Sequence, residues 1–296
     1  MNTIRGLIYD DAVSLTIIDG TELIKEGRKI HRLNKSSTIL FGKALLFTAF
    51  LSASLKGEKG SVSLLLKGDG SVQNLSLSGN YRLEIRGSID EPTSPVDLEK
   101  EGVEDASLIF QKEGSITVVR DDGYARPFVG AVEPVLGDLD RQFEEYFRIS
   151  EQLPTFLTSE IRFNEEGEVA FAGLVCLQPL PFASKEATKK SSDKSLQKKA
   201  IALMEKGVFL AGEKCYSASK EKMEEKEVRY RCNCSKNYIS GVLVSVGEKA
   251  LLDIVKEDGK VNVHCHYCNT DYNFYEEDIK ELFKDGKDDE GEGCKN

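Results

Sequence analysis

The sequence lacks an excess of positive charge, and this limits the partners it can attract. It carries 40 Lys and Arg residues against 50 Asp and Glu, which is a formal net charge of −10. A chain with this charge has no average long-range attraction to a nucleic-acid backbone or to an anionic membrane surface. We therefore expect no nucleic-acid partner and no membrane partner, and any basic surface must be local.

Long uninterrupted apolar runs are also missing. The N-terminal stretch MNTIRGLIYDDAVSLT has charged residues on both sides of a three-residue apolar run, so it lacks the core of a secretory signal. The longest apolar stretch, residues 39–55, is interrupted by Lys43 and by Ser and Thr residues, and it is short for a bilayer. These features predict a cytoplasmic protein in which residues 39–55 form a buried helix.

Motifs for hydrolytic or phosphate chemistry are absent. The chain has three histidines and no H-E-x-x-H motif, and His31 has no nucleophile beside it, so we interpret it as a surface or packing residue. The sequence Gly68-Asp69-Gly70 is not followed by a helix with the glycine spacing of a phosphate-binding loop, which favours a hairpin turn. We expect no catalytic residues and no enzyme activity.

What is present is enough apolar sequence for one large domain and a small one. The 296 residues are 40% hydrophobic, which suffices for an ordinary core. We predict an α+β protein with an N-terminal mixed α/β domain containing an antiparallel meander, a helical linker and a small C-terminal zinc-binding domain. The predicted bounds are 1–180 for the N-terminal domain, 181–231 for a charged, metastable linker, 232–285 for the zinc domain, and 286–296 for a disordered acidic tail.

Periodicity and turn signals predict several elements of these domains. Apolar residues run or alternate between turn residues across residues 61–89, which predicts three adjacent antiparallel strands. Leu139, Phe143, Tyr146 and Phe147 share one face of a helix that begins after Asp138 as its N-cap. Further signals predict a hairpin around residues 164–167 and helices within residues 195–207, 247–259 and 276–283.

The segment 181–231 differs in composition from the domains around it. Six lysines lie between Lys185 and Lys199, and apart from the helix within 195–207 the pattern predicts little stable structure. Two interpretations remain open here, and the sequence alone slightly favours the first. The segment is either a solvated helical connector or a region whose order depends on what it packs against.

Four of the seven cysteines form two close pairs. Cys232 and Cys234 have the spacing C-x-C, and thirty residues later Cys265 and Cys268 have the spacing C-x-x-C. A tetrahedral zinc site needs four soft ligands, and turns that each supply two sulfurs provide them. The sequence therefore predicts Zn²⁺ bound by these four cysteines, with Arg229, Arg231 and Lys236 near enough in the chain to offset part of the thiolate charge.

These cysteines are also compatible with uses other than a Cys₄ zinc site. Two disulfides are a transient state in a cytoplasm that keeps thiols reduced, and His264 or His266 could replace one sulfur in a Cys₃His site. Four cysteines already complete the ligand shell, which favours Cys₄. A four-ligand site leaves no position for a catalytic water, so it favours a structural or sensing role. Oxidation of the four cysteines would release the metal and unfold a small module that depends on it.

The remaining cysteines lie outside this pattern. Cys176 is in the apolar strand AGLVCLQ and is predicted to be a buried, inert thiol. Cys215 in the linker and Cys294 in the acidic tail are predicted to be free and exposed, where oxidation is possible.

The sequence resembles the redox-regulated 33 kDa chaperonin family (heat shock protein 33) over almost its whole length. The C-terminal signature is CNCS at 232–235 and CHYCN at 265–269, followed by Tyr272 and Phe274. The N-terminal domain contains the similar stretches LKGEKGSVSLLLKGDG, IRGSI, EEYFRISEQLPT and AGLVCLQPLP.

This resemblance implies a stress-response holdase, a chaperone that binds unfolding client proteins without ATP. In the family the reduced, zinc-bound form is inactive, and oxidation joins each cysteine pair in a disulfide, releases zinc, unfolds the zinc domain and linker, and promotes homodimer formation. Carried over to this chain, the disulfides would be Cys232 to Cys234 and Cys265 to Cys268.

Two other functions are compatible with parts of the sequence. A zinc-ribbon nucleic-acid or ribosome-binding protein is supported only by the lysines between Lys185 and Lys199. A thiol–disulfide oxidoreductase using Cys265 and Cys268 is disfavoured because no βαβ pattern surrounds them.

Overall fold

A computed structural model describes residues 1–124 and 126–284. The chain divides into two compact units, Met1–Arg231 and a second unit that begins at Cys232. The predicted tail, residues 286–296 with Cys294, lies outside the described residues.

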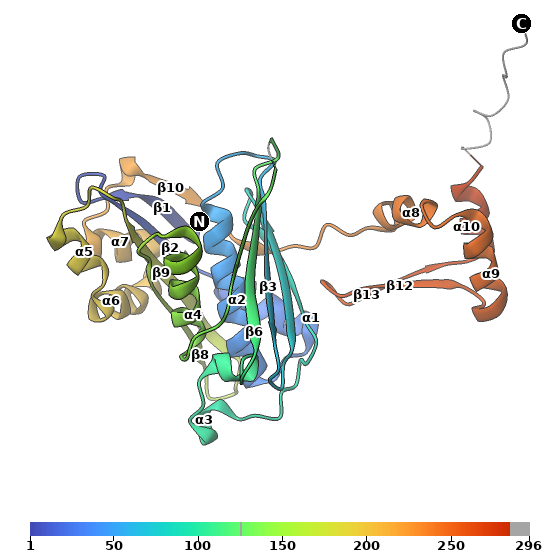
Figure 1. The fold of residues 1–296 in the computed structure, drawn as a ribbon, viewed down its shortest axis with the longest axis horizontal. Coiled ribbons are helices and arrows are strands. Elements are labelled where there is room, and N and C mark those ends of the chain that lie inside the picture. Colours follow the sequence, from blue (N-terminus) through green and yellow to red (C-terminus); the bar gives the residue numbers. More distant parts are fainter. Residues whose placement is uncertain (125, 285–296) are drawn as a thin grey trace, which may run out of the picture. The chain divides into compact units, whose positions relative to one another are not determined.

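The first unit contains a five-stranded antiparallel sheet (Figure 1). Its strand order is β10-β1-β2-β9-β8. The strands are β1 (Thr3–Ile8), β2 (Val13–Asp19), β8 (Phe156–Phe163), β9 (Val169–Pro179) and β10 (Met223–Lys226). β8 and β9 form the hairpin predicted around residues 164–167, since Asn164 and Gly167 close the turn with a 3.0 Å backbone hydrogen bond. The predicted hairpin is confirmed.

The second sheet of this unit has six strands and contains the meander. Its order is β11-β5-β4-β3-β6-β7, with β11 parallel to β5 and the other pairs antiparallel. The strands are β3 (Ser61–Gly68), β4 (Asn74–Asn80), β5 (Glu84–Ile89), β6 (Gly114–Asp121), β7 (Phe128–Val132) and β11 (Arg229–Tyr230). Alternate residues of β4 are buried, as expected for strands with one face on a core. The predicted three-stranded meander is confirmed.

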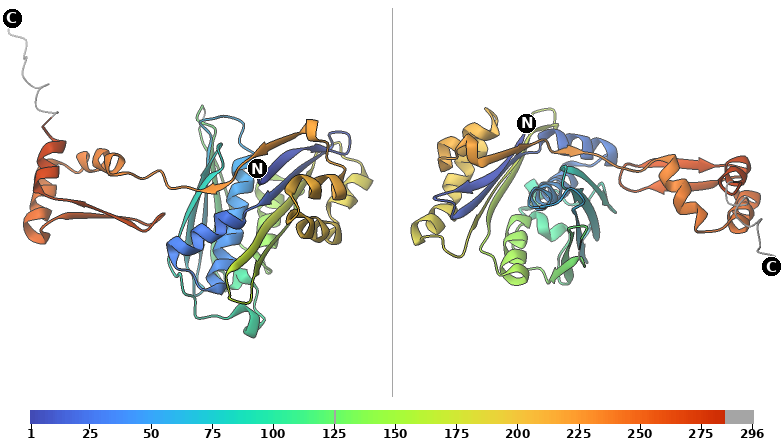
Figure 2. Two further views of the ribbon diagram at one scale, coloured as in Figure 1. Left: turned by 180° about the vertical axis from the view of Figure 1, so that it is seen from behind. Right: turned by 90° about the horizontal axis from the view of Figure 1, so that it is seen from above.

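A single apolar helix, α2 (Lys35–Ala53), packs against strands of both sheets (Figure 2). Asn34 is its N-cap and accepts a 2.9 Å hydrogen bond from the Ser37 backbone N–H. This is the one helix in the described ranges that is long and apolar enough to cross a membrane, with a mean hydropathy of 1.4, but 89% of that window is buried inside the fold. A helix that is apolar on all sides belongs in a core, and the predicted buried helix is confirmed.

Helix α4 (Leu139–Tyr146) begins as predicted. The Asp138 side chain accepts a 3.0 Å hydrogen bond from the Arg141 backbone N–H, and all four residues of the predicted stripe are buried. The helix continues through a π-helical turn, η2 (Phe147–Glu151). Phe143 stacks on Phe47 of α2 with ring centroids 3.7 Å apart, which joins α4 to the main core. The shorter helices here are α1 (Thr21–His31), α3 (Leu98–Glu101) and η1 (Asp105–Leu108).

The lysine-rich segment is folded. It forms α5 (Lys185–Ser191), α6 (Lys194–Met204), α7 (Val208–Tyr216) and η3 (Lys220–Lys222), followed by β10 and β11. The helices α5, α6 and α7 lie beside the five-stranded sheet (Figure 1). Their apolar residues, including Ala200, Ile201 and Met204, form a second core with Leu15, Val175 and other residues of that sheet. The segment is therefore packed on the sheet, and the solvated-connector interpretation is wrong. Sequence reasoning predicted only the helix corresponding to α6.

The second unit is a small fold around one hairpin. It contains α8 (Lys236–Val244), α9 (Glu248–Asp258), β12 (Val261–Cys265), β13 (Thr270–Phe274) and α10 (Glu276–Leu282). Within the described part of this unit, the core contains seven buried residues: Ile239, Leu243, Leu251, Val255, Val261, Phe274 and Ile279. The predicted helices near α9 and α10 are confirmed, whereas α8 was not anticipated.

Three residues outside the cysteine pairs, His31, Cys176 and Cys215, differ in how deeply they are buried. His31 is buried, with its ring centroid 5.2 Å from that of Phe41 and Nε2 3.0 Å from the Tyr230 hydroxyl, so the packing interpretation is correct. Cys176 is buried as predicted, and burial raises the pKa of its thiol. The prediction that Cys215 is exposed is wrong, because α7 packs on the sheet and leaves this side chain only partly accessible.

Candidate metal centre

The first cysteine pair lies immediately before α8. The Ser235 side chain accepts a 3.1 Å hydrogen bond from the Tyr238 backbone N–H and so begins the helix. The segment before this cap brings Cys232 Sγ and Cys234 Sγ to within 3.2 Å of each other. A C-x-C sequence ending at a helix cap thus presents two sulfurs close together.

The second pair lies at the tip of the β12–β13 hairpin. Cys265 is the last residue of β12, and its carbonyl accepts hydrogen bonds from the backbone N–H of Cys268 (3.3 Å) and of Asn269 (2.8 Å). Asn269 adopts the left-handed region at φ 51°, which asparagine tolerates better than most residues. This turn reverses the chain within the C-x-x-C sequence.

The two pairs converge on one another. Cys232 Sγ lies 3.7 Å from Cys265 Sγ, and Cys234 Sγ lies 3.2 Å from Cys268 Sγ. All four sulfurs lie within 4.8 Å of one another, and no histidine or carboxylate of residues 1–124 and 126–284 belongs to this group. These cysteines could hold a metal ion, and four soft sulfur donors suit Zn²⁺.

Burial and hydrogen bonds shift the pKa values of the four thiols in different directions. Burial raises the pKa of Cys232, Cys234 and Cys265. Burial also acts on Cys268, but hydrogen bonds with Thr270 and with neighbouring thiols outweigh it and lower its pKa to about 7. Thiolates this close together disfavour one another, and a bound cation would offset that repulsion.

Two hydroxyl groups touch the sulfurs, and sequence reasoning gave neither a role. The Tyr272 hydroxyl lies 3.2 Å from Cys234 Sγ, and Thr270 Oγ1 lies 3.3 Å from Cys268 Sγ. Both residues belong to β13. The sequence did contain a signal for this contact, namely the spacing of Thr270 and Tyr272, because residues two apart on a strand lie on the same face.

The neighbouring ionisable residues are paired elsewhere. His264 Nδ1 lies 2.9 Å from an Asp271 carboxylate oxygen, and neither His264 nor His266 belongs to the group of converging ligand atoms. Arg229 and Arg231 form ion pairs with Glu84, and Lys236 forms one with Asp278. The three cations predicted to offset the thiolate charge thus each have a carboxylate partner of their own.

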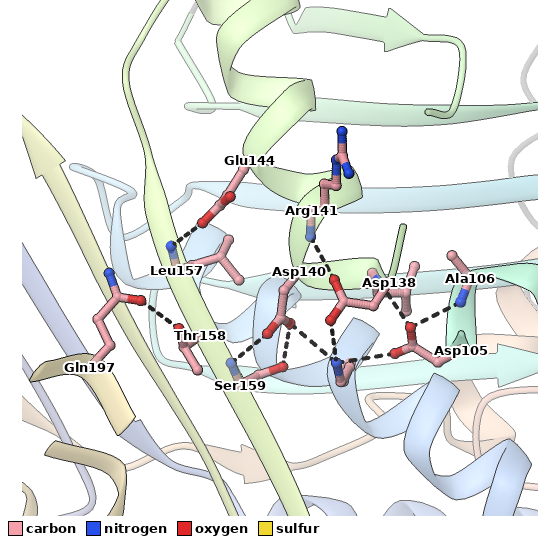
Figure 3. Close-up of polar contacts among 12 residues, drawn as sticks. Asp105, Ala106, Asp138, Asp140, Arg141, Glu144, Leu157, Thr158, Ser159 and Gln197 are labelled. Atoms are coloured by element: carbon pink, nitrogen blue, oxygen red, sulfur yellow. Dashed lines mark hydrogen bonds and ion pairs between the residues drawn. The ribbon is translucent and has the colours of Figure 1, made fainter. Parts of the chain in front are cut away.

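A second, partly buried cluster of ionisable groups lies in the first unit, between α2, η1, α4 and β8 (Figure 3). Lys43 Nζ lies 3.2 Å from Asp105, 3.7 Å from Asp138 and 3.6 Å from Asp140. Asp140 also accepts hydrogen bonds from the backbone N–H and the hydroxyl of Ser159. The Lys43 ammonium group already occupies the position between these carboxylates that a bound metal cation would take. We therefore interpret this cluster as a structural contact between elements and not as a metal site.

Comparison with known proteins places the chain in a family. The family model described as Hsp33 protein matches residues 2–275. The chain belongs to the Hsp33 family. The resemblance predicted from the paired cysteines and the N-terminal motifs is confirmed.

Relatives of similar length support this assignment. The 33 kDa chaperonin of Thermoanaerobacter sp. (strain X514) is 27% identical over 289 residues, covering 95% of this chain and 97% of the relative. The 33 kDa chaperonin of Bacillus cereus (strain G9842) is 29% identical over 291 residues, covering 95% and 98%. The names of these Hsp33 relatives describe chaperonins.

The fold agrees with a solved Hsp33 structure. The crystal structure of the 33 kDa chaperonin (heat shock protein 33 homolog) from Thermotoga maritima matches with a TM-score of 0.75 and 27% identity, covering 97% of this chain and 99% of that one. The predicted α+β class is confirmed. Membership of the Hsp33 family supports a chaperone function, which implies binding of unfolded client proteins.

Proposed function

We propose that this Hsp33 family member is a redox-regulated holdase that is inactive when reduced and active after oxidation of its paired cysteines. The observation that carries the proposal is the convergence of Cys232, Cys234, Cys265 and Cys268 within 4.8 Å of one another in a unit with a small core. The proposed localisation is the cytoplasm, where thiols rest in the reduced state.

In the reduced state the four thiolates would hold Zn²⁺. Ligands from both pairs would then join the first cysteine pair to the β12–β13 hairpin, next to a core that has seven buried side chains among the described residues. Four protein ligands leave no open position, so the site is proposed to be structural and regulatory and not catalytic.

Oxidation would remove the ligands. In each pair, two thiolates lose two electrons to one molecule of hydrogen peroxide, which takes up two protons and becomes two molecules of water, while one S–S bond forms. Cys234 Sγ lies 3.2 Å from both Cys232 and Cys268, so distance alone does not select the pairing. The proposal adopts the family pairing, Cys232 to Cys234 and Cys265 to Cys268.

Loss of the ligands would unfold the second unit and loosen residues 181–231. The helices α5, α6 and α7 of this segment pack on the five-stranded sheet, and the core beneath them includes Leu15, Ile17 and Val175. Uncovered apolar surface of this kind would bind unfolding proteins, and it would also favour the proposed homodimer. Client binding needs no bond-forming chemistry, so no enzyme activity is proposed.

The test follows metal, thiols and chaperone activity on the same samples. Peroxide at slightly elevated temperature should remove one Zn²⁺ per chain together with four thiols, and aggregation of a denatured client should fall. If zinc stays bound while only other thiols react, or if the oxidised chain does not suppress aggregation, the proposal is wrong.

A nucleic-acid function receives little support from the folded chain. In the lysine-rich segment, Lys190 pairs with Glu186 and Lys194 pairs with Glu144, which reduces the local positive charge. RNA or DNA titration at two salt concentrations distinguishes the functions, because phosphate binding weakens steeply as salt rises.

A further inference from the structure

One face of β13 connects the cysteine cluster to the core of the second unit. Thr270, Tyr272 and Phe274 are two residues apart, so their side chains share that face. Thr270 contacts Cys268, the Tyr272 hydroxyl contacts Cys234, and Phe274 is fully buried in the core. The strand that follows the second cysteine pair therefore reaches the first pair through Tyr272.

The chemistry of a metal ligand determines the direction of these hydrogen bonds. A cysteine that binds a metal is a thiolate, which has no proton and can only accept. The Tyr272 hydroxyl must then donate to Cys234. The Thr270 hydroxyl, which lies 3.3 Å from Cys268 Sγ and 3.4 Å from the Cys268 carbonyl oxygen, must share its proton between these two acceptors. The Tyr272 ring also packs against the apolar core, which holds its hydroxyl in position.

We propose that Tyr272 is a positioning residue for the first cysteine pair, donating a hydrogen bond to the Cys234 thiolate. Thr270 has the equivalent role for Cys268 in the second pair. This inference rests on the proposed zinc site and adds two residues that orient its ligands and protect them from oxidants. Partners of this kind in metal sites change affinity by about ten- to a hundredfold when they are removed.

Each donor protects the pair that it contacts. A hydrogen bond to a thiolate lowers the electron density on sulfur and therefore its nucleophilicity toward an oxidant. Without the Tyr272 hydroxyl, the first pair should react with peroxide sooner than the second. Without the Thr270 hydroxyl, the order should reverse.

The experiment uses the full-length reduced chain and the substitution Tyr272→Phe, which keeps the ring and removes one oxygen. Zn²⁺ affinity is measured by competition with a chromophoric chelator, and we expect it to fall about tenfold. Free thiols are trapped at intervals during peroxide treatment and assigned by mass spectrometry, with two electrons and one peroxide consumed per disulfide. Cys232 and Cys234 should disappear first.

Two further variants make the result specific. Tyr238→Phe removes an exposed hydroxyl from α8 of the same unit and should behave as the unmodified chain. Thr270→Val should accelerate loss of Cys265 and Cys268 instead. Equal zinc affinity and the same order of thiol loss in Tyr272→Phe and Tyr238→Phe would overturn the inference, whereas an unmodified chain that bound no Zn²⁺ would overturn the proposed function itself.

Discussion

At the scale of single residues, the most unusual environment is that of Asp140. Its side chain is buried among Lys43, Asp138 and Ser159, and burial raises its pKa from 3.8 to about 6 despite the attraction of Lys43 and the hydrogen bonds from Ser159. The cluster joins α2, α4 and β8 through charged groups (Figure 3). Its contribution to stability must therefore depend on pH.

The sign of that dependence follows from proton binding. Between about pH 4 and pH 6 the folded chain holds a proton on Asp140 that the unfolded chain has released. The stability contributed by this protonation is complete below pH 3.8 and is lost as pH rises through about 6. A shift of about two pKa units corresponds to about 3 kcal/mol.

Asp140→Asn should remove this dependence because an amide does not titrate. We expect the free energy of unfolding of the variant, relative to the unmodified chain, to rise by about 3 kcal/mol between pH 4 and pH 7. Urea unfolding at several pH values measures this difference, and Glu165→Gln in the exposed turn after β8 is the control. A constant difference between Asp140→Asn and the unmodified chain would contradict the assignment.

At the scale of elements, α6 is attached to the sheet by buried polar contacts as well as apolar ones. The Gln197 side chain is fully buried, accepts a hydrogen bond from the Thr158 hydroxyl of β8, and donates one to the Ser191 carbonyl (2.7 Å). On the adjacent residue of β8, Lys194 donates to the Leu157 carbonyl (2.6 Å). A buried polar group lowers stability when it has no hydrogen-bond partner, so these hydrogen bonds favour one docked position of α6. If α6 leaves the sheet, water can hydrogen-bond to the same groups, so α6 can also detach from the sheet.

Gln197→Leu should loosen this attachment while α6 remains helical. The Thr158 hydroxyl and the Ser191 carbonyl would lose their partner, which costs about 1–3 kcal/mol for each unsatisfied group. We expect backbone amides of α5 and α6 to exchange with solvent at least about fivefold faster in the reduced chain, as measured by mass spectrometry. Lys198→Leu changes an exposed position of the same helix and is the matched control; equal exchange in both variants would show that the Gln197 contacts do not hold α6.

At the scale of the whole molecule, the two units differ in what stabilises them. The first has two apolar cores built on eleven strands and several helices, whereas the second has one core of seven buried residues and the cysteine cluster. A core this small supplies little free energy beyond the cost of ordering the chain. The proposed metal therefore matters far more to the second unit than to the first.

Removing the metal should unfold the second unit and leave the first folded. After treatment of the reduced chain with a strong zinc chelator, we expect amides near Leu251, Val255 and Phe274 to lose protection from hydrogen exchange, while those of β2 and β9 keep theirs. Adding Zn²⁺ back should restore protection. Protection of the second unit without any metal would mean that its apolar core is sufficient by itself.

The sequence by itself determined those features that depend on local spacing. The C-x-C and C-x-x-C pairs, the apolar stretch of α2, the meander and the Asp138 cap were all recognisable because each signal lies within a few neighbouring residues. The family was also recognisable from these local motifs, and the comparisons confirm it.

Only the tertiary structure decided which distant residues meet. The lysine-rich segment looked weakly stable because most of its apolar partners, such as Leu15 and Val175, lie elsewhere in the chain. For the same reason, the predicted exposure of Cys215 was wrong. Tyr272 is assigned a role only because the hairpin brings its hydroxyl to Cys234. Burial and contact across long separations depend on how elements pack, and periodicity along the chain does not contain that information.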